Sequence, residues 1–480
     1  MNFPLVLKLL GGLFIILSLF LLIPGIFAIW IQEPEAINFF ISTAIGACLG
    51  CLLILLCKNA KGDLNHRTSM AIVTSTWIAA AILGGLPYYF SHVIPNFVDA
   101  YFESISGFSG TGSSVLSNLE SLPKSILLWR SMTQWLGGMG IIVFFLAILP
   151  FLGVGGVQLF RAETTGPSKD KITPRVHETA KKLWGIYLGL TILLTVLLYF
   201  AGMNLFDAVN HSFTTLATGG FSTRGDGIRA FQSPLIDYII IFFMFICSVN
   251  FSLHYQFLAG HGWKSYNTTE VKWYVSLLLL ATLGCTFLLW NIIPSPEASF
   301  REALFTVVCT SSSTGFTYTD YTLWPVGTHT IIIVLMAMGG MSGSTAGGLK
   351  CIRIAAALKQ LSKELKRVVH PHGVYTLKVN GQSVPDAVVS TIWGFIFLYF
   401  SVFIVVTLIL TFEGLDILSA STATFSALSN IGPAFGSLGP YDNFAEVGTV
   451  SKLALTVAML LGRLEFYTVL AIFTFDYWRK

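Results

Sequence analysis

Long apolar runs alternate with short polar loops along the whole chain. A helix rises about 1.5 Å per residue, so about 20 apolar residues cross the ~30 Å hydrocarbon core of a bilayer. Ten runs approach or exceed that length, at about 5–30, 36–57, 68–91, 125–152, 182–203, 233–258, 273–293, 326–360, 387–412 and 447–476. The first is too long for a signal-peptide core, and we expect it to be a retained helix. The pattern predicts an all-α polytopic membrane protein.

Four of the loops between these runs contain a shorter apolar segment that ends in a glycine. The four glycines are Gly112, Gly220, Gly315 and Gly432, and each has an alanine twelve positions earlier, namely Ala100, Ala208, Ala303 and Ala420. In three cases an acid precedes that alanine, namely Asp99, Asp207 and Glu302. The recurrence, roughly every hundred residues, predicts repeated units of span, short segment, glycine loop and span.

A short segment of this kind suits a helix that enters the membrane and stops near its middle. About 12 helical residues extend about 18 Å, roughly half the hydrocarbon thickness. The acid complements the positive end of the helix dipole, and the carboxyl end directs partial negative charge at the bilayer centre, which favours a cation. Glycine permits positive φ, so carbonyl oxygens can face one axis and replace the hydration shell of an ion. The alternative is four outside loops with ordinary turn glycines.

Composition supports a membrane location and excludes several functions. The chain is 54% hydrophobic and only 11% charged, with net charge +4, whereas soluble domains carry about 25% charged residues. The net charge is too small to indicate nucleic-acid binding. An intramembrane hydrolase would need a nucleophile or metal motif, and the sequence has neither G-x-S-x-G nor H-E-x-x-H. We therefore do not expect an enzyme.

Basic residues fall on alternate sides of the predicted spans. They are Lys58, Lys61, Arg67, Arg161, Lys169, Lys171, Arg175, Lys181, Lys182, those from Lys350 to Arg367, Arg479 and Lys480. The positive-inside rule places these segments and both termini in the cytoplasm. The loops near 92–96, 204–232, 294–325 and 413–446 then face outward.

Several motifs resemble those of one family. They are SGFSGTGSSVL (106–116), SILLWRSMTQWLGGMGI (125–141), TLATGGFST (215–223), SSSTGFTYTDY (311–321), GGMSGSTAGGLK (339–350) and LSNIGPAFG (428–436). Together they resemble the Trk/Ktr/HKT potassium transporters, most closely the bacterial TrkH/TrkG branch, over essentially the whole chain. The resemblance implies four membrane-pore-membrane repeats around a central pore, at 63–168, 169–262, 263–368 and 369–480, after two N-terminal transmembrane helices at 1–62.

The resemblance also implies a potassium selectivity filter. Its residues would be Gly110, Thr111, Gly112, Thr218, Gly219, Gly220, Ser313, Thr314, Gly315, Asn430, Ile431 and Gly432. Plant relatives with serine at the first glycine position admit sodium, so four glycines imply potassium. Two positions beyond the glycines stand Ser114, Ser222, Thr317 and Ala434, with no second glycine, which predicts weaker selectivity than in tetrameric channels. Pro433 lacks an N–H, so the fourth quarter should differ chemically from the others.

The run 326–360 contains a glycine-rich interruption. Five glycines between residues 339 and 350 make a continuous helix costly, at about 1 kcal/mol each. The resemblance implies an intramembrane gating loop with Gly339, Gly340, Ser342, Gly343, Ser344, Thr345, Gly347 and Gly348. Close helix packing through small residues is the alternative. A phosphate loop is excluded because Leu349 stands where the lysine should be.

Arg463 lies deep in the last apolar run, where an arginine costs roughly 2.5–3.5 kcal/mol. The family carries an arginine beneath the filter, so we expect Arg463 to belong to the gate, either facing the pore or pinning the loop. The alternative is a salt bridge to a neighbouring helix, perhaps through Glu465. Glu103 and His211, nine positions before their glycines, are more typical of local hydrogen bonding than of proton transport.

The expected function is potassium uptake across the bacterial inner membrane through a gated, glycine-lined filter. The alternative is a symporter that couples potassium entry to protons or sodium through Glu103, His211 or Arg463. The chain shows no nucleotide fold and no cofactor motif apart from sites for bound K+. Partners implied by the resemblance are a second copy of the chain and a cytosolic nucleotide-binding ring of the TrkA type. Asn380-Gly381 between alternating residues predicts a cytoplasmic hairpin.

Overall fold

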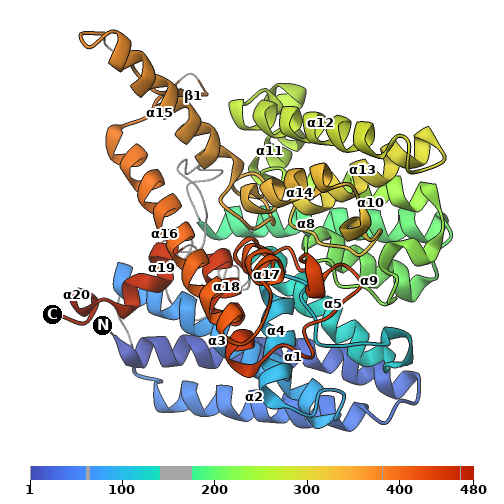
Figure 1. Ribbon diagram of the computed structural model, residues 1–480. Helices are drawn as coiled ribbons and strands as arrows, with labels where there is room; N and C mark the ends of the chain where they lie inside the picture. The colour runs from blue at the N-terminus through green and yellow to red at the C-terminus, as the bar shows by residue number, and fades with distance from the viewer. Residues whose placement is uncertain are drawn as a thin grey trace.

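The computed structural model describes residues 2–60, 65–140, 176–373, 375–380, 382–464 and 466–479, and this part is mainly helical, with one short two-stranded hairpin (Figure 1). Within these described ranges, six helices are long and apolar enough to cross a membrane. They are α1 Phe3–Trp30, α2 Ala36–Leu56, α3 His66–Phe90, α8 Val176–Phe200, α12 Thr269–Leu289 and α16 Asp386–Phe412. The prediction of an all-α protein with several apolar spans is confirmed.

The remaining predicted runs are not simple spans. α10 Pro234–Ser248 is followed, at a bend of 96°, by α11 Phe251–Gln256, and α18 Thr449–Leu464 is followed, at a bend of 117°, by α19 Phe466–Leu470. The predicted runs at 233–258 and 447–476 are therefore each broken into two helices that meet at a sharp bend. At the first bend, the Asn250 side chain accepts from the Ser252 amide at 2.8 Å and begins a new helix.

Two other runs are shorter helices than their apolar length suggests. α14 Val326–Met338 ends at Gly339, and α15 Cys351–Val369 begins twelve residues later, so the interruption predicted in 326–360 is present. α5 Lys124–Gly138 covers the first half of the run 125–152. Residues 141–152 of that run, and residues 169–175 of the basic segment 169–182, lie outside the described residues.

Four short helices correspond to the predicted half-length segments. They are α4 Phe97–Ser109, α9 Leu205–Leu216, α13 Pro296–Ser311 and α17 Ile417–Ser429. The four matched alanines are all fully buried, as expected of equivalent positions. The expectation of an acid at each start holds for Asp99 and Asp207 but is wrong for Glu302, because α13 begins six residues before it. α17, which has no acid directly before its matched alanine, follows Asp416, whose carboxylate caps the helix.

Short elements complete the chain. They are η1 Leu119–Ser121, η3 Gly227–Phe231, the π-helix η4 Phe257–His261, η5 Gly262–Tyr266, η6 Tyr321–Leu323, η7 Gly436–Leu438, η8 Ala471–Phe473, α20 Phe475–Trp478, β1 Lys378–Val379 and β2 Gln382–Ser383. The two strands pair antiparallel around Asn380, which has φ 51°, and this confirms the predicted hairpin. The Asn380 carboxamide accepts from the Thr269 amide at 2.7 Å and so fastens the hairpin to the start of α12.

The buried apolar residues form two large clusters. One joins α1, α3, α4 and α5 to α16, α17 and α18, around Trp77 and Trp129. The other joins α8 through α14, around Tyr187 and Tyr274. Each cluster holds two of the four short helices, α4 and α17 in the first and α9 and α13 in the second, so all four are packed inside the protein.

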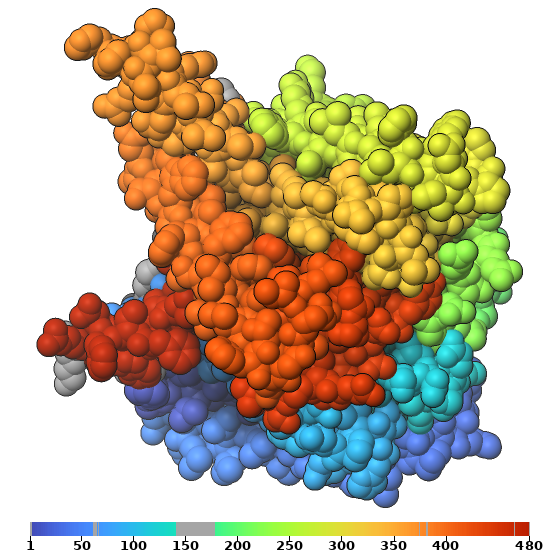
Figure 2. Space-filling model, in the orientation of Figure 1, coloured from blue at the N-terminus to red at the C-terminus, as the bar shows by residue number. Residues whose placement is uncertain are grey.

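The chain termini lie together at one end of the molecule (Figure 1). The rings of Phe3 and Trp478 stack with centroids 6.1 Å apart, and the Tyr477 hydroxyl donates to the Arg67 carbonyl at 2.5 Å. Both ends thus sit near Arg67, although the side of the membrane they face stays a prediction. α15 projects from the body of the molecule in Figure 2 and carries exposed Leu361, Leu365 and Val368.

Candidate ion-conduction site

Each of the four short helices ends in the same backbone geometry. Its glycine is in the left-handed region, and so is the residue two positions earlier. The φ values are 72° and 85° for Gly110 and Gly112, 50° and 76° for Thr218 and Gly220, 55° and 69° for Ser313 and Gly315, and 53° and 107° for Asn430 and Gly432. We call the segments 110–112, 218–220, 313–315 and 430–432 the ring segments.

A shared hydrogen bond closes each helix at its ring segment. In all four, the amide just before the glycine donates to the carbonyl five residues earlier, at 2.9 Å. The pairs are Thr111 to Ser106, Gly219 to Thr214, Thr314 to Cys309 and Ile431 to Ser426. This is the hydrogen bond of a Schellman turn, which satisfies a carbonyl at the helix end and reverses the chain direction. The matched glycines therefore mark matched structures.

The ring segments contact one another in a closed cycle. A Cβ added to Gly112 would lie 2.3 Å from the Gly219 carbonyl oxygen, and one added to Gly220 would lie 2.0 Å from that of Thr314. A Cβ on Gly315 would lie 1.5 Å from the Ile431 oxygen, and one on Gly432 would lie 2.8 Å from the Thr111 oxygen. First meets second, second meets third, third meets fourth, and fourth meets first. The sequence-predicted filter residues are thus brought together in one ring.

Most carbonyl oxygens of the ring have no donor of their own. Among the described residues, no hydrogen bond reaches the carbonyls of Thr111, Gly112, Gly220, Thr314, Gly315 or Ile431. The Gly219 carbonyl accepts from Gln134 Nε2 at 2.6 Å, and the Gly432 carbonyl accepts from Ser113 Oγ at 3.1 Å. Carbonyl oxygens without donors are the ligands that replace water around a potassium-sized cation. The carboxyl ends of four helices add partial negative charge to the same place.

The segment 339–350 lies directly against this ring. The Gly347 amide donates to Ser313 Oγ at 2.7 Å, and a Cβ on Gly347 would lie 2.2 Å from the Ser429 carbonyl. Gly339 also packs on this stretch, because its added Cβ would lie 2.3 Å from the Gly347 carbonyl. The predicted gating residues thus form one compact loop in contact with two ring segments.

The break between α10 and α11 holds the same loop. The Met341 amide donates to the Ser248 carbonyl at 3.0 Å, and the Phe251 amide donates to the Gly343 carbonyl at 3.0 Å. Thr345 Oγ1 donates to the Cys247 carbonyl at 3.1 Å. The end of α10 has carbonyls that a continuous helix would have used internally, and the loop supplies their donors.

The remaining predicted gating residues form hydrogen bonds close to the α10–α11 break. The Ser342 amide donates to Glu270 Oε1 at 2.7 Å, and Ser344 Oγ donates to the Met341 carbonyl at 2.6 Å. The Gly340 carbonyl accepts from the Cys351 amide at 3.0 Å, at the start of α15. Gly348 has φ 84°, which only glycine adopts readily.

Arg463 ties the loop to a second helix end. Its Nη1 donates to the Thr345 carbonyl at 2.6 Å, and its Nη2 donates to the carbonyls of Gly137 and Gly138 at 2.6 and 2.5 Å. Gly137 and Gly138 are the last residues of α5, where the carbonyls no longer accept from amides of the helix itself, and the Gly137 carbonyl also accepts from the Gly140 amide at 3.0 Å. The guanidinium therefore contacts the loop 339–350, in agreement with the expectation that Arg463 pins this loop. Glu465, named in the other, lies outside the described residues.

Sequence reasoning missed Gln134, which supports the second ring segment. Its Nε2 donates to the Gly219 carbonyl, and its Oε1 accepts from the Phe221 amide at 3.1 Å. A carboxamide that bonds a carbonyl and an amide of one loop fixes that loop's backbone. Its position in an apolar helix, one turn after Arg130, was a signal that could have identified it.

Glu103 and His211 make the local hydrogen bonds that were expected of them. Glu103 accepts from Ser114 Oγ at 3.0 Å and from the Val115 amide at 2.9 Å. The two ring nitrogens of His211 lie 2.8 Å from the Asp207 carbonyl and 3.0 Å from Ser222 Oγ. Because the carbonyl can only accept, Nδ1 carries the proton and Nε2 accepts from the serine.

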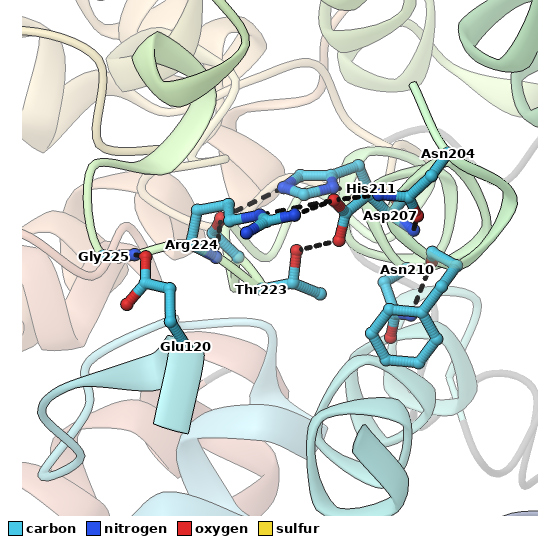
Figure 3. Close-up of polar contacts among 10 residues, drawn as sticks. Glu120, Asn204, Asp207, Asn210, His211, Thr223, Arg224 and Gly225 are labelled. Carbon is cyan, nitrogen blue, oxygen red and sulfur yellow. Dashed lines mark hydrogen bonds and ion pairs between the residues drawn. The ribbon is translucent and has the colours of Figure 1, made fainter. Parts of the chain in front are cut away.

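The surroundings of His211 form a polar cluster that is buried at His211 and Asp207 and partly exposed at Arg224 (Figure 3). The Asp207 carboxylate accepts from Thr223 Oγ1 at 2.6 Å and from Arg224 Nη2 at 2.9 Å, and the Asn204 side chain caps the same helix. Figure 3 shows Glu120 reaching this loop from another part of the chain, where it accepts from the Gly225 amide at 2.7 Å. The cluster holds the outer side of the second ring segment in place.

Comparisons with known proteins agree with this arrangement. Residues 35–477 match the family model TrkH, described as a cation transport protein. The chain is 40% identical, over all of both sequences, to the Trk system potassium uptake protein TrkH of Escherichia coli strain K12. It is 33% identical to TrkG of the same organism, over 98% of this chain and 97% of that protein. A crystal structure of the potassium transporter TrkH from Vibrio parahaemolyticus superposes with a TM-score of 0.90 at 38% identity, covering both chains completely.

Proposed function

Because the chain belongs to the TrkH family of cation transport proteins, a multi-pass membrane family, we propose that it takes up potassium ions through the ring described above. Membership confirms the family resemblance read from the motifs, and it makes the protein a transporter rather than an enzyme. Curated relatives of full length are potassium uptake proteins. The printed names of those relatives support potassium as the transported ion.

The closed cycle of ring segments is the observation that carries this proposal. Four quasi-equivalent turns contact one another in a cycle, and most of their carbonyl oxygens have no donor among the described residues. An ion entering there exchanges water oxygens for carbonyl oxygens, which is the basis of potassium selectivity in channel filters. Two of the ring carbonyls, those of Gly219 and Gly432, are engaged by side chains. This asymmetry supports the weaker selectivity expected from the sequence.

The loop 339–350 is proposed as the gate. It contacts the ring through Gly347 and Ser313, is docked in the α10–α11 break, and is held by Arg463. Its glycines allow it to change conformation, and its hydrogen bonds define a held position from which it must be displaced. The alternative of ordinary helix packing by small residues is not favoured, because residues 339–350 are not helical.

Conduction without coupling is favoured over the symport alternative. A coupled proton needs a group that gains and loses it during transport. Glu103 accepts three hydrogen bonds, including one from Arg130, and both nitrogens of His211 are bonded. Arg463 is bonded to three carbonyls. These engaged groups support a channel-like path.

The cellular setting is also proposed from the family. The relatives are named as proteins of a Trk system, which supports a multi-component assembly. We place the chain in the bacterial inner membrane with both termini cytoplasmic, as a homodimer with a nucleotide-binding ring on the α15 side. Projection of α15 and the hairpin beyond the helical body supports that side as the contact surface (Figure 1).

Flux measurements on the purified chain in liposomes test the proposal. A potassium gradient should drive a current that reverses at the potassium equilibrium potential, and collapsing proton or sodium gradients should leave that potential unchanged. Dependence of the reversal potential on either gradient would establish the symport alternative. Absence of potassium flux from folded protein would refute the proposal as a whole.

A further inference from the structure

A buried ion pair stands behind two neighbouring ring segments. Arg130 on α5 is 3% exposed and Glu103 on α4 is fully buried. Arg130 Nε lies 2.7 Å from Glu103 Oε1. The matching positions of the other three short helices hold His211 on α9, Thr306 on α13 and Ala423 on α17, so this carboxylate belongs to the first quarter alone.

The carboxylate of Glu103 holds the chain that leaves the first ring segment. It accepts from Ser114 Oγ at 3.0 Å and from the Val115 amide at 2.9 Å, immediately after Gly112. With the guanidinium, three donors occupy its two oxygens. Charge-assisted hydrogen bonds of this kind are shorter and stronger than neutral ones, so the exit of the first ring segment is firmly placed.

The guanidinium of Arg130 holds the chain that leaves the second ring segment. Its Nη1 donates to the Ser222 carbonyl at 3.0 Å, and its Cζ lies 3.5 Å from the centroid of the Phe221 ring. A planar guanidinium can bond in its plane and stack on its face at once, which an ammonium group cannot do. One side chain thus contacts both the carboxylate of the first quarter and the backbone of the second.

We propose that Glu103 and Arg130 form a positioning pair that sets the spacing between the first and second ring segments, and thereby the preference for potassium over sodium. The inference rests on the proposed function, since the spacing matters only if the ring binds the ion. A ring of carbonyl oxygens distinguishes cations by the spacing at which its oxygens are held, because that spacing fits one ion size better than another. The pair joins residues two positions beyond Gly112 and Gly220, so it acts at the outer edge of the ring and touches no ion itself.

Neutral substitutions test the pair. Glu103→Gln leaves one acceptor oxygen for three donors and turns an NH2 group toward one of them. Arg130→Gln is too short to join Glu103 to Ser222 and loses the stack on Phe221. Each should lower the ratio of potassium to sodium flux, measured in proteoliposomes of the full chain, about tenfold. Arg130→Lys retains the charge without the fork and should restore part of the ratio.

A double variant covers the case in which a lone buried charge prevents folding. In Glu103→Gln/Arg130→Gln both charges are absent, and two carboxamides can bond to each other. We expect it to fold and to remain about tenfold less selective, because the contact with Ser222 is still missing. Selectivity equal to the wild-type value in this folded variant overturns the proposal.

Trp129→Phe is the matched control. Trp129 is the neighbour of Arg130 on α5, is fully buried, and donates from Nε1 to the Gly84 carbonyl on α3 at 2.9 Å. Its indole packs edge-on against Phe108 of α4, with centroids 6.3 Å apart, and phenylalanine keeps an aromatic ring at that contact. This change should lower the thermal midpoint and leave the flux ratio within about twofold of wild type. An equal loss of selectivity in the control would assign the effect to general destabilisation and overturn the positioning role. Wild-type protein that carries no potassium would instead refute the proposed function, and the inference with it.

Discussion

Replacing each ring glycine by alanine should impair transport to a graded extent that the geometry fixes. All four glycines have positive φ, so alanine costs at least about 1–2 kcal/mol of backbone strain at each. The steric cost differs. The Ile431 carbonyl would have to retreat about 1.9 Å from a Cβ on Gly315 to reach ordinary contact at 3.4 Å, whereas the Thr111 carbonyl would retreat only about 0.6 Å from one on Gly432.

The expected order of damage is therefore Gly315, then Gly220, Gly112 and Gly432. A misplacement of about 1 Å at a reacting or binding centre costs about a hundredfold, and we expect at least that loss of potassium flux for Gly315→Ala. For Gly432→Ala we expect a loss below about tenfold, since its neighbour needs to move by less than 1 Å. The distances of 2.0 and 2.3 Å at Gly220 and Gly112 place their variants between these limits.

Gly202→Ala separates steric from conformational effects. Gly202 has φ 108°, yet an added Cβ would have no atom within 4 Å. This variant should lose stability through its dihedral angles while its flux per folded molecule stays at the wild-type level.

The assay measures potassium flux into liposomes, divided by the number of protein molecules reconstituted. Size-exclusion profiles confirm that each variant is monodisperse and folded. Gly432→Ala proving more damaging than Gly315→Ala would refute the ring geometry. So would wild-type flux from folded Gly315→Ala.

Three further changes have definite expected results. Arg463→Gln removes charge-assisted hydrogen bonds worth about 1.5 kcal/mol or more from the loop, so the displaced loop should become about tenfold more populated and basal flux should rise; unchanged flux from folded protein would contradict the gate. Gln134→Leu leaves the Phe221 amide without its acceptor at a cost of about 1–3 kcal/mol. The midpoint temperature of unfolding and the potassium-to-sodium flux ratio should therefore both fall. An unchanged ratio would show that Gln134 does not support the ring. Asp416→Ala removes the cap of α17 and should cost about 1 kcal/mol, whereas Asp416→Asn should keep the cap. Hydrogen bonds from Ser419 hold the pKa of Asp416 below its usual value. The charge of Asp416 therefore stabilises the fold above a pH of about 4, and that contribution disappears at lower pH. If the wild type stayed more stable than Asp416→Asn in acid, this reasoning would be contradicted.

The short helices and the ring were predictable because their signals are local and repeated. An alanine and a glycine at a fixed spacing recur four times, and each pair maps onto a buried helix face and a left-handed turn. The interruption after Met338 was equally visible, since glycines alone disfavour helix there. The boundaries of the five chain segments and the roles of the filter and gate residues stay predictions.

The bends and the supports of the ring were not predictable because their partners are distant in sequence. The break at Asn250 is compensated by Met341 and Gly343, almost a hundred residues away, and an apolar run gives no indication that it ends early. Gln134 supports Gly219 across 85 positions. An isolated polar residue in an apolar run indicates that a partner exists, but not which loop provides it.

Because one polypeptide supplies all four quarters of the ring, each quarter is encoded separately. A codon change in a channel built from four identical subunits alters every quarter at once, whereas here it alters a single side of the opening. The carbonyls of Gly219 and Gly432 accept side-chain hydrogen bonds, unlike the neighbouring ring carbonyls. A ring built from four identical subunits could not carry such a difference in only some of its quarters. Ion preference in such a protein is open to adjustment in steps of one quarter, by mutation or by design.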